Sequence, residues 1–136
     1  MKELLNMTAL ELGAVIRRGE VSPEEAVQTA LDAQADLNSF VTRTPERALE
    51  RARALLPGVK DARSPLYGVP MALKDNICTR GVKTTCASKI LGDFAPPYSA
   101  TLVEKLSDTG AVSLGKLNMD RYKAPICSSV PIVMRR

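Results

Sequence analysis

Lys74, Asp75 and Asn76 directly follow the short apolar run Val69–Leu73, and their types and spacing are the most suggestive of chemistry in the sequence. The run predicts a buried strand that ends at Lys74. Sites in α/β proteins tend to lie at the carboxyl ends of strands. A lysine can accept a proton only when its amine is neutral, and this requires desolvation to lower its pKa. The alternative interpretation is a solvated lysine in an ordinary turn.

Other residue types exclude several kinds of site. The chain has no histidine, so a Ser-His-Asp triad cannot be built from it. Its three cysteines, Cys78, Cys86 and Cys127, are odd in number and have no CxxC spacing, which argues against a disulfide framework or a structural metal site. Without histidine to activate them, Cys78 and Cys86 are interpreted as packing residues. Asp75 and Asn76 are interpreted as turn residues that bond nearby backbone.

Length and charge set the broad class. A chain of 136 residues with 45% hydrophobic residues is enough for one domain. Its net charge of +4 is modest, and it is spread along the chain and partly loaded into the last sixteen residues, so it does not predict the clustered basic face that binds nucleic acid. Acidic residues interrupt the first thirty positions, unlike a signal or transit peptide, and no apolar run approaches the ~20 residues that a membrane span needs. We therefore expect a soluble, cytoplasmic protein without membrane contact.

The N-terminal third is predicted to be helical. Thr8 and Glu11 form a T-x-x-E capping box before an apolar stripe, and Gly19 is placed to end that helix. Ser22 followed by Pro23 predicts the start of a second helix. Residues 40–42 could form a short strand, and residues 44–45 open a third helix that a Pro-Gly pair at 57–58 ends.

The pattern changes after the predicted loop 60–66. Strands are predicted at 69–73 and 111–117. A helix is predicted between them, with Ser99 as its N-cap and Gly110 at its end. Its apolar face is predicted to contain Leu102, Val103 and Leu106. Both strands are expected to leave sheet edges unpaired and stability marginal. Helices followed by strand, helix and strand predict an α/β domain with helices against a sheet. Residues 121–136 lack either periodicity.

The segment Ser64–Asn76 resembles the amidase signature family, which carries a G-[IV]-P-x-x-[LVI]-K-D-N pattern. Two further blocks, Thr-Thr-Cys-Ala-Ser-Lys-Ile-Leu at 84–91 and Gly-Lys-Leu-Asn-Met-Asp at 115–120, are similar to the A subunits of glutamyl-tRNA(Gln) amidotransferases within that family. The resemblance covers residues 1–120. It implies an α/β fold with a mixed sheet flanked by helices, of which this chain is the N-terminal portion with a helical N-terminal region.

The resemblance also implies a Ser–cis-Ser–Lys triad in which Lys74 is the catalytic lysine. It assigns no catalytic role to Lys116 or Asp120. After Asp120 the sequence departs from the family, and Ser128 and Ser129 have no glycine beside them, so neither is assigned as the nucleophile. We therefore expect the catalytic serines to be missing. Residues 121–136 are expected to be a tail that is not native to the fold, in a truncated or frame-disrupted product.

The implied function is ammonia supply. The complete subunit would hydrolyse glutamine, and its B- and C-type partner subunits would use the ammonia, with ATP and magnesium on the partner, to convert Glu-tRNA(Gln) to Gln-tRNA(Gln). No cofactor is expected on this chain, which is expected to be inactive alone, so whether it is an enzyme by itself stays open. The alternatives are a fragment of a general amidase that hydrolyses small amides and a non-catalytic interaction module.

Overall fold

A mixed three-stranded sheet lies at the centre of the fold. The computed structural model describes residues 3–34 and 38–119. Its strands are β1 (Phe40–Arg43), β2 (Pro70–Lys74) and β3 (Val112–Leu117), in the order β1-β3-β2. β3 runs antiparallel to β1 and parallel to β2. The predicted α/β class is confirmed. The expectation that 111–117 leaves an unpaired edge is wrong, because β1 pairs with the side of β3 that β2 leaves open.

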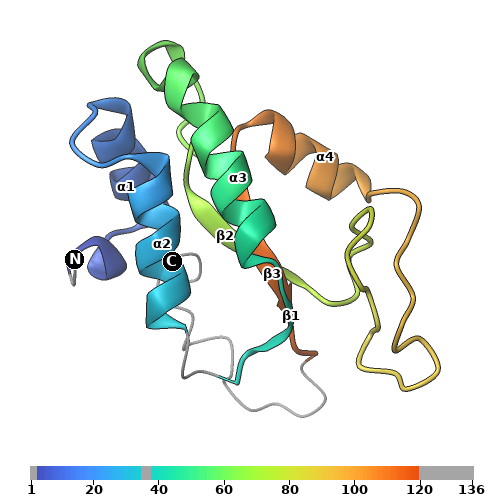
Figure 1. The fold of residues 1–136 in the computed structure, drawn as a ribbon. Helices are drawn as coiled ribbons and strands as arrows, with labels where there is room; N and C mark the ends of the chain where they lie inside the picture. Colours follow the sequence, from blue (N-terminus) through green and yellow to red (C-terminus); the bar gives the residue numbers. More distant parts are fainter. Residues whose placement is uncertain (1–2, 35–37, 120–136) are drawn as a thin grey trace.

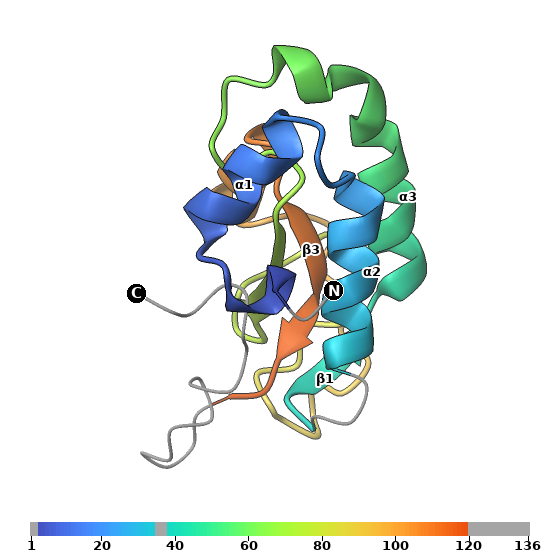
Figure 2. The ribbon, with the colours of Figure 1, turned by 90° about the vertical axis from the view of Figure 1, so that its left-hand side faces the viewer.

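Helices cover both faces of this sheet, as Figures 1 and 2 show. Helices α1, α2 and α3 pack on one face, and α4 packs on the other. The helical elements are η1 (Leu4–Asn6), α1 (Ala9–Arg17), α2 (Pro23–Ala33), α3 (Pro45–Leu55), η2 (Leu56–Asp61) and α4 (Thr101–Asp108). The predicted loop 60–66 therefore begins as the end of η2, since the chain continues from α3 into a 3-10 turn through the Pro-Gly pair.

Helix starts follow the capping residues in two cases and depart from them in a third. The Thr8 side chain accepts from the Glu11 amide at 3.3 Å, and Glu11 accepts from the Thr8 amide at 2.7 Å, which confirms the capping box. Ser22 caps α2. The prediction for Ser99 is wrong: Ala100 is the N-cap of α4, and the Ser99 hydroxyl accepts from the backbone amide of Arg80 at 3.0 Å instead.

Two apolar clusters hold these layers together. The larger joins α1, α2 and α3 to β3 and includes Ile16, Val27 and Val112, all fully buried. The smaller joins β2 to α4 through Met71 and Leu73, packed against half-buried side chains of α4. Leu102, predicted to lie on the apolar face of α4, is 51% exposed. The helix therefore buries a narrower stripe than its sequence predicts.

Gly115 allows β1 to approach β3 closely. Its φ is +147°, and a Cβ built there would lie 2.3 Å from the Thr42 carbonyl oxygen. Only glycine fits such a position without moving the neighbouring backbone. The pairing of β2 with β3 is also irregular next to this residue, between Met71 and Leu73. The predicted tail 121–136 lies outside the described residues, so the boundary near residue 120 stays a prediction.

Candidate active site

Lys74 is the last residue of β2, where the sequence predicts it. It lies opposite Leu117 in the parallel pairing of β2 with β3. The chain turns immediately afterwards, because the Ile77 amide donates to the Lys74 carbonyl at 3.0 Å. A long irregular segment then leads to α4, as Figure 1 shows. The Lys74 side chain is exposed on the surface of the described residues.

Asp75 points the opposite way and is fully buried. Its Oδ2 accepts two hydrogen bonds from Thr85, one from the amide at 3.2 Å and one from the hydroxyl at 2.5 Å. Its backbone joins the same layers, since its amide donates to the Leu117 carbonyl and its carbonyl accepts from the Cys86 amide. Asp75 thus bonds backbone as expected, but backbone ten residues away rather than in the adjacent turn. Asn76 is exposed.

The segment that Asp75 holds makes a tight turn with an unusual backbone. The Ser88 amide donates to the Thr85 carbonyl at 2.8 Å, and the two central residues, Cys86 and Ala87, have φ values of +50° and +54°. These values are typical of a type I′ turn, which glycine and asparagine favour. Cys86 is exposed, so its interpretation as a packing residue is wrong. Cys78 is only half-buried, with its thiol 3.6 Å from the Tyr98 hydroxyl.

Lys116 is the functional-looking residue that sequence reasoning did not assign. It is fully buried, and its amine donates to the Ile77 carbonyl, to the Thr84 hydroxyl at 3.0 Å and to the Thr79 hydroxyl at 3.4 Å. Burial lowers the pKa of Lys116, and the negative charge of Asp75 opposes that shift. The available signal was a lysine inside an otherwise apolar strand.

Lys116 and Asp75 together fix the loop that leaves Lys74. Asp75 binds Thr85, ten residues further along the loop. Lys116 binds the part of the loop between them, at Ile77, Thr79 and Thr84. The backbone on which Lys74 stands is therefore tied to both β2 and β3. The exposed amine of Lys74 therefore extends from backbone whose neighbouring loop is held by hydrogen bonds to Asp75 and Lys116.

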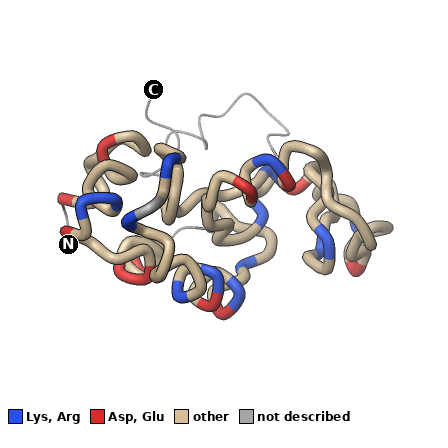
Figure 3. The backbone as a smooth tube through the Cα atoms, turned by 90° about the horizontal axis from the view of Figure 1, so that it is seen from above, with Lys and Arg blue, Asp and Glu red and all other residues tan. Residues whose placement is uncertain are grey.

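The described residues also limit the kinds of site available. They contain no group of three or more His, Cys, Asp or Glu side chains that could hold a metal ion. No helix within 3–34 or 38–119 is long and apolar enough to cross a bilayer. Figure 3 shows basic and acidic residues interspersed along the backbone, which does not favour a nucleic-acid interface.

Comparison of the chain with known proteins identifies its family. The profile of the family described as Amidase matches residues 24–132, which is more than half of the chain. The chain belongs to the amidase family. Its relatives include the glutamyl-tRNA(Gln) amidotransferase A subunits of Moorella thermoacetica, 48% identical over 88% of this chain, and Ehrlichia ruminantium, 43% identical over 90%. The resemblance deduced from the three sequence blocks is confirmed.

Solved amidases share the fold. An amidase family protein from Bacillus anthracis is 34% identical over 88% of this chain, with a TM-score of 0.79. The peptide amidase of Stenotrophomonas maltophilia is 32% identical over 84% of the chain, with a TM-score of 0.76. The chain spans 26% of the two A subunits and 25% of each of these structures. It therefore represents about a quarter of the complete fold.

Proposed function

We propose that this chain forms the lysine-bearing part of the glutamine-hydrolysing A subunit of a Glu-tRNA(Gln) amidotransferase. The observation that carries the proposal is the position of Lys74: it stands exposed at the carboxyl end of β2, on a loop that Asp75 and Lys116 anchor. The 48% identity to the M. thermoacetica subunit supports this enzyme over other amidases. Lys74 is thus accessible outside the core, while hydrogen bonds from buried residues hold the adjacent loop.

The proposed chemistry is acyl transfer from nitrogen to oxygen. A serine hydroxyl attacks the carboxamide carbon of glutamine, and its proton passes through a second serine to the neutral amine of Lys74. The lysine then returns a proton to the departing nitrogen, which leaves as ammonia, and water releases glutamate from the serine ester. Lys74 must be neutral at the first step, so the proposal requires further protein to cover its amine.

We assign both serines to the part of the relatives that this chain does not span. The chain alone is then expected to release no ammonia from glutamine. In the complete assembly, B- and C-type subunits would receive the ammonia, and the partner that binds ATP and magnesium would activate Glu-tRNA(Gln). No cofactor is assigned to this chain, and the proposal places it in the cytoplasm, where aminoacyl-tRNA is used.

A chimera tests the role of Lys74 in a complete enzyme. Residues 1–119 of this chain replace the matching segment of the M. thermoacetica A subunit, which is co-expressed with its partner subunits. Ammonia release from glutamine is measured for the chimera, for Lys74→Met and for Lys105→Met, an exposed lysine of α4 that serves as the matched control. We expect Lys74→Met to lower turnover at least about a thousandfold, as loss of a triad member does.

The controls separate the possible outcomes. Co-purification of the partner subunits shows that a variant is folded and assembled. Activity of the assembled Lys74→Met chimera close to that of Lys105→Met would overturn the catalytic role of Lys74. Ammonia release by the 136-residue chain alone would overturn the assignment of the serines elsewhere.

A general amidase is the second candidate, and its support is the similarity to the peptide amidase. Hydrolysis of small amides in preference to glutamine by the chimera would favour it. A non-catalytic interaction module is the third, supported by large apolar side chains on the loop before α4, of which Ile90 is 95% exposed. An unsubstituted chimera that retains its partner subunits but hydrolyses neither glutamine nor small amides would favour that candidate.

A further inference from the structure

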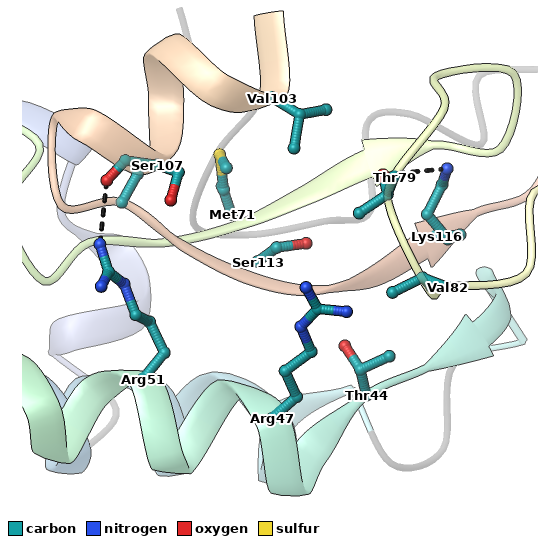
Figure 4. Close-up of a pocket in the computed structure, with 11 residues that line it drawn as sticks. Thr44, Arg47, Arg51, Met71, Thr79, Val82, Val103, Ser107, Ser113 and Lys116 are labelled. Atoms are coloured by element: carbon teal, nitrogen blue, oxygen red, sulfur yellow. Dashed lines mark hydrogen bonds between the residues drawn. The ribbon is translucent and has the colours of Figure 1, made fainter. Parts of the chain in front are cut away.

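A cavity of about 190 Å³ with both polar and apolar side chains in its wall lies between α3 and α4, beside β3. Lys74 is not among the residues that line it. Figure 4 shows two arginines rising into it from α3, with Ser113 of β3 between the helices. The side chains that matter for its chemistry are Thr44, Arg47, Arg51, Ser107, Ser113 and Lys116. The triad proposed above uses none of them.

The two arginines are held in place by backbone carbonyls. Arg47 and Arg51 are one helical turn apart on α3 and so share a face. Arg47 Nη1 donates to the Arg80 carbonyl at 3.0 Å, and Arg51 Nη2 donates to the Ser107 carbonyl at 3.0 Å. Each bond uses one of the five N–H donors of a guanidinium. The carbonyls therefore fix the direction of each side chain and leave most of its donors for a ligand.

The charge in this cavity is not balanced. None of the described side chains that line it is a carboxylate. The ion pairs found within the described residues join Glu20, Glu24 and Asp93 to cations other than these two arginines. Lys116 also lines the wall, but its amine is directed away from the cavity, onto the loop acceptors, and interacts with the charge of Asp75. A concave site with charge of one sign concentrates counter-ions of the other.

Neutral donors complete the site. The Ser113 hydroxyl is half-buried and lies between the two helices in Figure 4. Thr44 is the N-cap of α3, and its side chain makes no capping hydrogen bond, so its hydroxyl is available where the helix dipole favours negative charge. Donors thus approach from α3 and from β3. Donors that approach from two elements can each reach a different oxygen of a tetrahedral oxyanion, and charge-assisted bonds from arginine to phosphate are strong.

We propose that this cavity binds a phosphate-type dianion, free or as a monoester, between the guanidinium groups of Arg47 and Arg51 and the hydroxyls of Ser113 and Thr44. The bound anion neutralises the two arginines and ties α3 to β3. The site is separate from Lys74, so it works whether or not Lys74 is catalytic.

The test is an NMR titration of the ¹⁵N-labelled 136-residue chain. Sodium phosphate, phenyl phosphate, sulfate and acetate are added separately at constant ionic strength, held with sodium chloride, and the amides of Thr44 and Ser113 are followed. We expect saturable shifts with phosphate and sulfate and none with acetate. Saturation by phenyl phosphate as well would extend the ligand to monoesters, and its failure beside phosphate would assign the site to the free ion.

Three arginine-to-glutamine variants of α3 make the test specific. Arg47→Gln and Arg51→Gln should each weaken binding at least about tenfold, because each removes a charge-assisted donor. Arg53→Gln is the matched control, since Arg53 lies on the same helix but pairs with Glu24 outside the cavity. Ser113→Ala is a fourth variant, which changes β3 and leaves α3 unchanged, and it should weaken binding less. Equal effects of all three glutamine variants, shifts that never saturate, or equal shifts with acetate would overturn the proposal.

Discussion

Thr85 donates two hydrogen bonds to one oxygen of Asp75, from its amide at 3.2 Å and from its hydroxyl at 2.5 Å, and both residues are buried. Hydrogen bonds to a charged acceptor are stronger than neutral ones, and a buried carboxylate depends on them. The other oxygen, Asp75 Oδ1, is buried with no partner among the described residues. The Thr85 contacts therefore stabilise the carboxylate and the loop after Lys74 together.

The first prediction follows from this pair. Thr85→Val keeps the shape of the side chain but removes the hydroxyl, which also accepts from the Ala87 amide at 3.2 Å. We expect the free energy of unfolding to fall by about 2 kcal/mol, as for a hydrogen bond to a charged group. Urea denaturation measures it. Thr101→Val is the control, because Thr101 is exposed on α4 and should change stability by less than about 0.5 kcal/mol. Equal losses in both variants would contradict the role of the hydroxyl.

Lys116 predicts a pH dependence of stability. Burial lowers its pKa in the folded chain from the ordinary value of 10.5, which the unfolded chain approaches. Between these two values the unfolded chain binds more protons than the folded chain, so this residue makes stability rise with pH. The loss of stability caused by burying the charged amine of Lys116 is complete below its pKa in the folded chain. It decreases as the pH rises toward 10.5.

Urea denaturation at several pH values between 7 and 10 measures the free energy of unfolding of the wild-type chain and of Lys116→Met, and the pH dependence of their difference reports on Lys116. The stability of the wild-type chain should rise with pH relative to Lys116→Met, which has no amine to titrate. Loss of the three hydrogen bonds of Lys116 also lowers the stability of the variant, but that offset does not change the sign of the slope. Lys105→Met, at an exposed lysine, should follow the wild-type profile. Parallel profiles for wild type and Lys116→Met would refute the prediction.

Local signals explain what the sequence predicts correctly. The capping residues Thr8 and Ser22 act within one helical turn, so their partners are visible a few positions away. The position of Lys74 at the end of a strand is likewise predicted from the apolar run just before it. The pairing of β1 with β3 could not be found in this way, because the two strands are far apart in sequence and both have several possible partners.

The same limit hides the roles of Lys116 and Gly115. A lysine in an apolar strand shows that something unusual occurs, but its acceptors at Ile77, Thr79 and Thr84 are brought to it only by the return of the loop over β3. The need for glycine at 115 arises from the Thr42 carbonyl on another strand. Tertiary contacts of this kind leave no periodic pattern in the sequence.

The close approach of β1 to β3 gives a third prediction. Gly115→Ala places a methyl group within 2.3 Å of a backbone oxygen that cannot move without separating the strands. We expect a loss of about 3 kcal/mol in the free energy of unfolding. Gly19→Ala is the matched control: its φ is also positive, at +75°, but nothing lies within 4 Å of the added Cβ. It should cost only about 1 kcal/mol, from backbone conformation alone. Equal costs would show that β1 yields without penalty.

The turn at Thr85–Ser88 gives a prediction of the opposite sign. Ala87 has a φ of +54°, a conformation that costs an L-residue about 1 kcal/mol and glycine almost nothing. Ala87→Gly should therefore raise the free energy of unfolding, less the extra entropy that glycine gives the unfolded chain, for a net gain of a few tenths of a kcal/mol or more.

Ala54→Gly is the control for that entropy, because Ala54 is exposed on α3 with helical backbone and should lose about 1 kcal/mol. Thermal and urea unfolding of the two variants compare them directly. Opposite signs would show that the backbone beside Asp75 is held in its left-handed conformation against local preference. Equal losses in the two variants would mean that the left-handed conformation of Ala87 costs no more than a helical one, which would contradict the prediction.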